Sequence, residues 1–515
     1  MNIQSFLEHH GILRNPFAEE DAQTDPVFKD HCIVSAYHPI WDKVYGDPSE
    51  PSTSIVFGPK GSGKTAMRLQ IERQIDQYND EHPGDRVFMI RYDDFNPFLD
   101  HFFERLGKRY ASNDSKGLDR WRLWDHMDAI LCIGVTDLVD RILHPERDGG
   151  IDRDTLKVLD RNDARDLLLL ATSYDQSTES SFSDRFSRLR RRLHYGNFTT
   201  IWPTLLAIAS LVGSVALVVW LFVRSGGADE AIEVPVGDAA AAKEAVEEIA
   251  AAGPSPHVLW LIPVLTLIGS LPFLIRWLRC HFAARGIHKH MRVGKRESGS
   301  VRWALRNIPP AELASQPLPR YDRTDDRYEL LRKFQQLIRR LGYDGIVVLV
   351  DRVDEPHRTG GQVPLMQRLV FPMLDNKLLK HPGIGFKMFL PEELYREVER
   401  QNREFHERAR MDKQNVIPAF SWTGEAMYDL ARARMMACAA EGRSPEPKDL
   451  FGEDLSYDRM LSAFQSLKVP RHLFRFLYRV LVDHCNRHTD SDAQYKIDDR
   501  TFESILAVYS REVEV

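Results

Sequence analysis

The most constraining feature of the sequence is a glycine-rich octapeptide, residues 58–65, between an apolar run and a helix-forming run. The octapeptide reads GPKGSGKT and fits the pattern G-x-x-x-x-G-K-[ST]. Residues 53–57 are apolar and β-branched, which predicts a buried strand, and the residues from Ala66 onward favour a helix. In this setting, glycines let backbone N–H groups surround a phosphate, and the helix N-terminus adds its positive dipole. The segment therefore predicts a nucleotide phosphate site.

Individual residues of this loop have distinct expected roles. We expect Lys64 to reach the β- and γ-phosphates and the Thr65 hydroxyl to hold Mg²⁺. An ordinary glycine-rich turn is the alternative, but such a turn does not require the flanking strand and helix. The residues expected to contact the nucleotide are Gly58, Pro59, Lys60, Gly61, Ser62, Gly63, Lys64, Thr65 and Ala66.

A second apolar strand with acidic residues at its end supplies the other half of such a site. Residues 346–350 read IVVLV and lead directly into Asp351. A carboxylate at the end of a buried strand is suited to hold Mg²⁺, so we assign that role to Asp351. A further carboxylate should orient the attacking water. Because Arg352 occupies the next position, the candidates for that role are Asp354 and Glu355.

Two long stretches without charge lie between these halves. Residues 198–223 and 258–275 contain no charged side chain, and each is about long enough to cross a bilayer as a helix. Two buried core helices are the alternative, but the flanking charges argue against it. Residues 225–257 carry seven acidic residues and Lys243 as their single base. This asymmetry predicts a membrane hairpin whose two outer ends are cytoplasmic.

Basic residues cluster on both outer flanks of the hairpin. We therefore expect a two-helix protein of the cell inner membrane, with its N- and C-termini in the cytoplasm and basic side chains near lipid headgroups. Neither stretch holds an ionisable residue, which argues against an ion path through the hairpin. The basic residues are Arg185, Arg188, Arg190, Arg191 and Arg192 before the first stretch, and Arg276, Arg279, Arg285, Lys289, Arg292, Lys295 and Arg296 after the second.

Further apolar runs predict an α/β fold. Pro418 in the last run suggests an edge strand, and residues 392–413 read as one charged helix. A short helix is expected at 239–252, between the apolar stretches. The expected strands are 53–57, 86–92, 346–350, 385–390 and 415–420.

The chain divides into five predicted segments. These are an N-terminal extension at 1–50, a first part of the nucleotide domain with a helical insertion at 51–185, the hairpin with its flanks at 186–300, a second part of the nucleotide domain at 301–422, and an all-helical domain at 423–515.

Composition restricts the classes of function. The 515 residues have a formal net charge of −6, which argues against broad nucleic-acid binding. Five scattered cysteines without a C-x-x-C pair are typical of a reducing cytosol. The N-terminus has charges and a proline where a signal peptide needs an apolar core.

Three motifs together resemble one family. Residues 58–65, the D-x-h-D-E form of 351–355, and Lys-Val-Pro-Arg at 468–471 are similar to AAA+-related P-loop NTPases of the STAND and KAP type. KAP NTPases carry transmembrane helices between their two nucleotide motifs, as at 198–275 here. This chain departs from the KAP pattern at Arg352, where paired acids are more usual. It also lacks an evident first-sensor residue after the fourth expected strand.

The resemblance implies a three-layer P-loop NTPase with a parallel central sheet and an AAA+-like helical lid. In such a lid, Arg471 would contact the γ-phosphate, so the implied catalytic residues are Lys64, Asp354, Glu355 and Arg471. ATP with Mg²⁺ is the expected cofactor, and GTP is left open. The resemblance also implies a homo-oligomer with a separate effector or sensor protein, in bacterial signalling that includes anti-phage defence.

Two other functions fit the same motifs. Because of Arg352 and the missing first sensor, the chain is alternatively a nucleotide-gated membrane scaffold that recruits a partner with little turnover. A membrane-tethered AAA+ nucleic-acid motor or loader is a further alternative. The acidic net charge of the chain opposes it.

Overall fold

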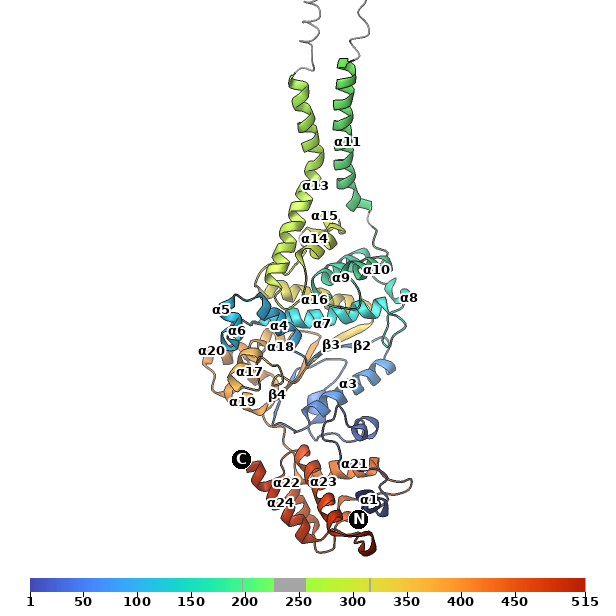
Figure 1. Cartoon of the computed structure of the whole chain (residues 1–515), viewed down its shortest axis with the longest axis vertical. Coiled ribbons are helices and arrows are strands. Elements are labelled where there is room, and N and C mark those ends of the chain that lie inside the picture. Colours follow the sequence, from blue (N-terminus) through green and yellow to red (C-terminus); the bar gives the residue numbers. More distant parts are fainter. Residues whose placement is uncertain (197, 227–255, 315, 515) are drawn as a thin grey trace, which may run out of the picture. The chain divides into compact units, whose positions relative to one another are not determined.

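Figure 1 shows the computed structural model of the whole chain. The chain divides into two units. The first comprises Met1–Gly134 and Leu331–Val515, and the second Val135–Leu330. Two helices, α7 (Leu123–Leu143) and α16 (Thr324–Arg340), continue from one unit into the other. The structure describes residues 1–196, 198–226, 256–314 and 316–514.

Five parallel strands form the sheet of the first unit, in the order β2-β3-β4-β1-β5. The α/β class is thereby confirmed. The last strand lies at an edge, as predicted, but it ends before Pro418 and is shorter than expected. The strands are β1 (Ser54–Gly58), β2 (Arg86–Tyr92), β3 (Tyr343–Val350), β4 (Ile384–Pro391) and β5 (Asn415–Ile417).

Both faces of the sheet are covered by apolar side chains. On one face, Val56 and Val347 pack with Met67 of α3 (Lys64–Glu81). On the other face, Val348 lies beside Met127 of α7. Because successive strand residues point to opposite faces, strands buried on both sides read as continuous apolar runs. This burial explains why the strands could be recognised.

The strand order places the glycine loop and the acidic segment at the same edge of the sheet. The chain leaves β1 toward β2 and leaves the neighbouring β4 toward β5, in opposite directions along the sheet. In open α/β sheets, such a divergence creates a crevice outside the carboxyl ends of the strands. The glycine loop follows β1, and Asp351 follows β3.

The N-terminal residues and the C-terminal helices share one core. Phe6, Phe17 and Phe28 are buried together with side chains of the four C-terminal helices. The backbone N–H of Leu13 donates to the carbonyl oxygen of Cys438 at 2.8 Å. The helices are α1 (Ile3–His9), the π-helix η1 (Phe28–Cys32), α21 (Gly424–Ala437), α22 (Tyr457–Ser466), α23 (Pro470–Arg487) and α24 (Asp499–Glu514).

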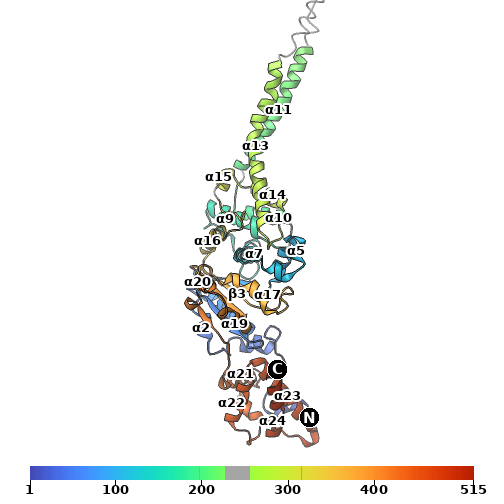
Figure 2. The ribbon, with the colours of Figure 1, turned by 90° about the vertical axis from the view of Figure 1, so that its left-hand side faces the viewer.

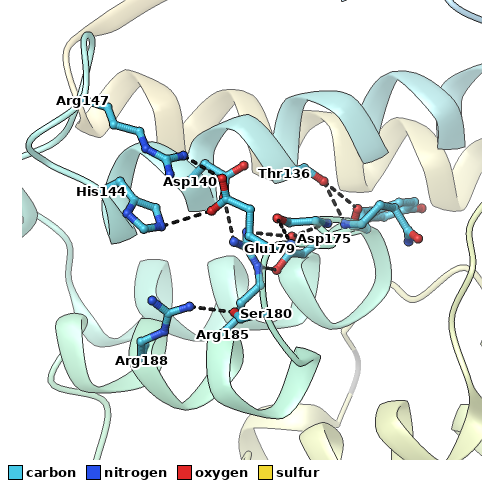
Figure 3. Close-up of polar contacts among 12 residues, drawn as sticks. Thr136, Asp140, His144, Arg147, Asp175, Glu179, Ser180, Arg185 and Arg188 are labelled. Carbon is cyan, nitrogen blue, oxygen red and sulfur yellow. Dashed lines mark hydrogen bonds and ion pairs between the residues drawn. The ribbon is translucent and has the colours of Figure 1, made fainter.

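A buried ionic network joins helices of the second unit (Figure 3). Arg185 of α10 (Phe182–Arg192) is 1% exposed and makes two 3.0 Å hydrogen bonds to Asp175, which follows α9 (Arg161–Tyr174). Its third nitrogen lies 2.7 Å from Asp140 of α7. Arg185 is therefore a core ion-pair residue, and the expectation that it faces lipid headgroups is wrong.

Two long helices carry the uncharged stretches and run side by side (Figures 1 and 2). They are α11 (Phe198–Gly226) and α13 (Pro256–His290). Among the described residues, one helical stretch, Ile201–Trp220, is long and apolar enough to cross a membrane, and none of it is buried. The helix expected at 239–252 lies outside the described residues.

Small and hydroxyl residues bring these two helices into contact. The Ser214 and Thr266 hydroxyl oxygens are 2.6 Å apart. A Cβ atom on Gly269 would lie 2.3 Å from the hydroxyl oxygen of Ser210. The small residues Ser210, Ser214 and Gly269 thus let the two helices pack closely.

Short helices complete both units. The single helix expected at 392–413 is divided: its first part ends at Glu399, and the side chain of Asn402 caps the helix that follows. The remaining elements are α2 (Trp41–Tyr45), α4 (Asn96–Arg105), α5 (Lys108–Ala111), α6 (Asp114–Leu118), α8 (Arg153–Leu156), α14 (Ser298–Arg306), α15 (Pro310–Leu313), α17 (Val363–Val370), η3 (Phe371–Met373), α18 (Asn376–Leu379), α19 (Glu392–Glu399), α20 (Arg403–Ala409), η4 (Met411–Lys413), η5 (Pro447–Leu450) and η6 (Asp490–Asp492).

Candidate functional site

The loop between β1 and α3 has the conformation that its glycines allow. Gly61 and Gly63 have φ angles of 84° and 97°, a region that residues with a Cβ atom rarely adopt. Gly61 is also crowded, since a Cβ atom there would lie 2.8 Å from the Cβ of Arg471. Gly63 is the N-cap of α3, and no side chain caps that helix. The first N–H groups of α3 are thus suited to an anionic ligand.

Lys64 is held by its own loop. Its Nζ donates to the carbonyl oxygens of Gly58 at 2.7 Å and Pro59 at 2.9 Å. Burial lowers the pKa of Lys64, and the nearby carboxylates of Asp351 and Asp354 oppose that shift. The ammonium group therefore lies within the field of the acidic segment after β3.

The two predicted halves of the site meet through one hydrogen bond. The Thr65 hydroxyl donates to Oδ2 of Asp351 at 3.0 Å, although the two residues are 286 positions apart. Asp351 is 2% exposed. Burial raises the pKa of its carboxyl, and Arg68 is the strongest of the groups that lower it. A hydroxyl and a carboxylate oxygen so placed match the oxygen ligands that Mg²⁺ prefers.

Arg68 is a site residue that the sequence did not reveal. It lies one turn after Thr65 in α3, and its guanidinium contacts three carboxylates. Nη1 is 2.5 Å from Glu72 and 3.0 Å from Asp93, and Nε is 3.3 Å from Asp351. Its side chain is 3% exposed. Arg68 thus fixes the Asp351 carboxylate from the side of α3.

The two candidate water-orienting acids lie in the same cavity lining as Lys64 and Asp351. Arg352 takes a φ of 60°, and its Nε lies 3.6 Å from Oε1 of Glu355. Burial raises the pKa of Glu355, which the Arg352 charge lowers in turn.

The C-terminal helices contribute Arg471 to this lining. Arg471 lies in the first turn of α23, and its backbone N–H donates to the carbonyl oxygen of Gly61 at 3.3 Å. Its Nε lies 3.9 Å from Oε2 of Glu20, an N-terminal residue that also bonds Arg475 at 2.6 Å. Arg471, the residue predicted to contact the γ-phosphate, therefore lies next to the glycine loop and is held there by a backbone hydrogen bond.

A cavity of about 170 Å³ lies among these groups. Its lining contains Lys60, Gly61, Gly63, Lys64, Thr65, Ala66, Asp351, Arg352, Asp354, Glu355 and Arg471, together with aromatic side chains such as Phe28, Phe420, Trp422 and Phe474. Three predicted contact residues lie outside the lining. Gly58 and Pro59 hold Lys64, and the carbonyl oxygen of Ser62 accepts a hydrogen bond from Trp422. Charged groups for phosphates and an aromatic wall suited to a flat base thus occur together.

Comparisons with protein-family models, curated proteins and solved structures gave no match for this chain. Among the described residues, no group of three or more His, Cys, Asp or Glu side chains is arranged to hold a metal ion. A nucleotide-bound Mg²⁺ does not need such a group, because phosphate and water oxygens supply most of its ligands.

Proposed function

We propose that this chain is a membrane-anchored nucleotide switch that binds and hydrolyses an NTP. The observation that carries the proposal is the 3.0 Å hydrogen bond between Thr65 and Asp351. It joins a glycine loop and an acidic strand end that lie 286 positions apart in the sequence, with the whole second unit between them. A hydroxyl oxygen and a carboxylate oxygen placed together in this way can both coordinate the Mg²⁺ of a bound nucleotide.

Each residue has a chemical task in this proposal. Lys64 and Arg471 hold phosphate oxygens, while Thr65 and Asp351 hold Mg²⁺, which when bound neutralises charge on the phosphates. Asp354 or Glu355 orients the attacking water and accepts its proton. ATP is the expected nucleotide because of the family resemblance, with GTP left open.

The membrane part of the proposal is a two-helix hairpin formed by α11 and α13, with both chain termini in the cytoplasm. The apolar stretch Ile201–Trp220 supports it directly, and the basic residues after 275 support the orientation. In the sequence, the hairpin is inserted between the two halves of the nucleotide site. A nucleotide-dependent rearrangement could therefore change assembly at the membrane. We further propose that the chain forms a homo-oligomer and acts with a separate effector or sensor protein in anti-phage defence.

Two substitutions test the nucleotide chemistry in the purified full chain. Lys64→Ala should abolish nucleotide binding, whereas Glu355→Gln should keep binding and slow hydrolysis. Lys108→Ala, which removes an exposed lysine of α5, is the control and should change neither. ATPase activity that is unchanged in Lys64→Ala would contradict the proposal.

A weakly hydrolysing scaffold is the second candidate. It is favoured by Arg352, which stands directly after Asp351 and lies 3.6 Å from Glu355. In a scaffold, turnover would be no higher in the unmodified chain than in a chain with Asp354→Asn and Glu355→Gln. Steady-state hydrolysis with and without lipid separates the two functions.

A further inference from the structure

A cavity of about 1020 Å³ lies in the second unit, between the second half of α13 and the chain from Ile308 to Tyr321. Its lining begins among apolar residues, including Leu271 and Ile275, and continues past the point where α13 becomes basic. The uncharged stretch of this helix ends at Ile275. In the membrane position proposed above, the cavity would therefore lie where hydrocarbon gives way to headgroups.

The basic wall of this cavity consists of three arginines. Arg276 is buried and donates to the carbonyl oxygens of Arg306 and Ile308. The buried Nε of Arg320 has no hydrogen-bond partner among the described residues. Arg279 is exposed and also lines the cavity.

The lining as a whole is positively charged. Within the described part of the chain, no aspartate or glutamate belongs to it. His290 also lines the cavity, but its Nδ1 lies 3.0 Å from Asp322, so we do not count it as a group for a ligand. A cavity with several cations and no acid is complementary to an anion.

One buried acceptor adds a second requirement. Oε1 of Gln316 is buried and has no hydrogen-bond partner among the residues that the structure describes. A buried oxygen left without a donor is costly. A ligand with a hydroxyl group beside its anionic group would satisfy both Gln316 and the arginines.

We propose that this cavity binds one anionic glycerophospholipid with a hydroxylated headgroup. Its phosphate contacts Arg279 and Arg320, its headgroup hydroxyl donates to Gln316, and an acyl chain follows Leu271 and Ile275. This inference rests on the membrane part of the proposed function and not on the nucleotide chemistry. It differs from diffuse attraction of basic side chains to a charged surface, because a walled cavity selects one lipid molecule.

Exposed basic residues on the same helix supply a matched control. Arg285 and Lys289 are exposed and do not line the cavity. The double variant Arg285→Gln/Lys289→Gln removes the same charge as Arg279→Gln/Arg320→Gln but leaves the cavity intact. Arg279→Gln alone provides a second test, because an exposed side chain can be replaced without disturbing the core.

The experiment is native mass spectrometry of the full chain in detergent, with phosphatidylglycerol, phosphatidylcholine or inorganic phosphate added. We expect phosphatidylglycerol to bind at least about tenfold more tightly than phosphatidylcholine, because charge-assisted hydrogen bonds are strong. The cavity double variant should lose about tenfold or more of that affinity, and Arg279→Gln alone part of it. The surface double variant should change it by less than about threefold.

Three results would overturn the proposal. One is an equal loss of phosphatidylglycerol affinity in the cavity double variant and the surface double variant. Another is equal affinity for phosphatidylglycerol and phosphatidylcholine. The third is displacement of phosphatidylglycerol by millimolar phosphate, which would indicate an anion site without acyl contact. Flotation of the chain with phosphatidylcholine vesicles separates this failure from that of the proposed function. A chain that does not float overturns both the hairpin and the lipid site, and a chain that floats without lipid preference overturns the lipid site alone.

Discussion

Replacing Arg68 by methionine should destabilise the first unit strongly and in a pH-dependent way. The substitution keeps the apolar length of the side chain but leaves three carboxylates without their shared cation. Glu72, Asp93 and Asp351 lie 2.5, 3.0 and 3.3 Å from the guanidinium. The side chains of Arg68 and Asp351 are each 3% exposed, so water cannot replace the lost charge.

The distances set the size of the effect. Two unit charges 3.3 Å apart attract by about 5 kcal/mol at an effective dielectric constant of about 20. The cost of burying the guanidinium offsets part of this, and breaking a buried pair typically costs about 3–5 kcal/mol. We therefore expect Arg68→Met to lower the free energy of unfolding by about 3–5 kcal/mol at pH 7.

The pH dependence follows from the pKa of Asp351. Burial already raises this pKa, and Arg68 is the main group that lowers it. Without Arg68 the native carboxyl binds its proton up to a higher pH than the unfolded one. The native variant then holds more protons than the unfolded chain, so its stability falls as pH rises. The deficit relative to the unmodified chain should be small at low pH and should grow toward pH 7.

Urea unfolding of the full chain in detergent, followed by tryptophan fluorescence from pH 5 to 8, measures this deficit. Arg91→Met is the control, because Arg91 also contacts Glu72, at 3.2 Å, but is 55% exposed. It should cost no more than about 1 kcal/mol. Adding Asp351→Asn to Arg68→Met should recover part of the loss. A deficit that is absent, or equal at every pH, would refute the reasoning.

Two further predictions concern the sheet and the loop. Lys387 is buried in β4, and burial lowers its pKa from 10.5 to about 8. Lys387→Met removes this penalty, which is roughly 3 kcal/mol below pH 8, but also removes the 2.9 Å hydrogen bond from Nζ to the Tyr45 carbonyl oxygen, so the chain should gain no more than about 2 kcal/mol. The lysine loses its proton at a lower pH in the native chain than in the unfolded chain, so the gain in stability should shrink between pH 8 and 10.5. Unfolding measured at these two pH values tests this. Gly61→Ala should cost about 1–3 kcal/mol and weaken nucleotide binding, since its φ is 84° and its Cβ would meet Arg471. Gly107→Ala, with φ of −61° and open space around it, should be neutral in the same unfolding and binding assays.

The sequence reveals the sheet because burial on both faces leaves a direct trace in it. The predicted second strand, 86–92, coincides with β2. The glycine loop and Asp351 were paired by chemical role alone, and their side chains are in contact. Features that depend on one stretch of chain, or on a known chemical partnership, could therefore be predicted.

Features that depend on distant partners left no such trace. Arg68 reads as a surface residue of a helix, paired with Glu72 one turn later, and its burial depends on Asp93 and Asp351 from two other segments. Arg185 reads as part of a basic flank, yet it is buried by Asp140 and Asp175. The charge of an arginine does not predict whether it pairs with a carboxylate in the core, because the partner carboxylates are distant in the sequence.

The contacts of the N-terminal extension also depend on partners distant in the sequence. They determine which part of the chain would move together in a conformational change. The sequence predicts residues 1–50 as an N-terminal extension without named contacts, and in the structure Phe6 and Phe17 complete the core of the C-terminal helices. Two hydrogen bonds hold the glycine loop by its carbonyl oxygens: the backbone N–H of Arg471 in α23 donates to Gly61, and the indole N–H of Trp422, just before α21, donates to Ser62. A displacement of these helices from the glycine loop would break both hydrogen bonds and, because of the shared core, would carry the N-terminal residues along. A nucleotide-dependent change would therefore involve both ends of the chain as one body.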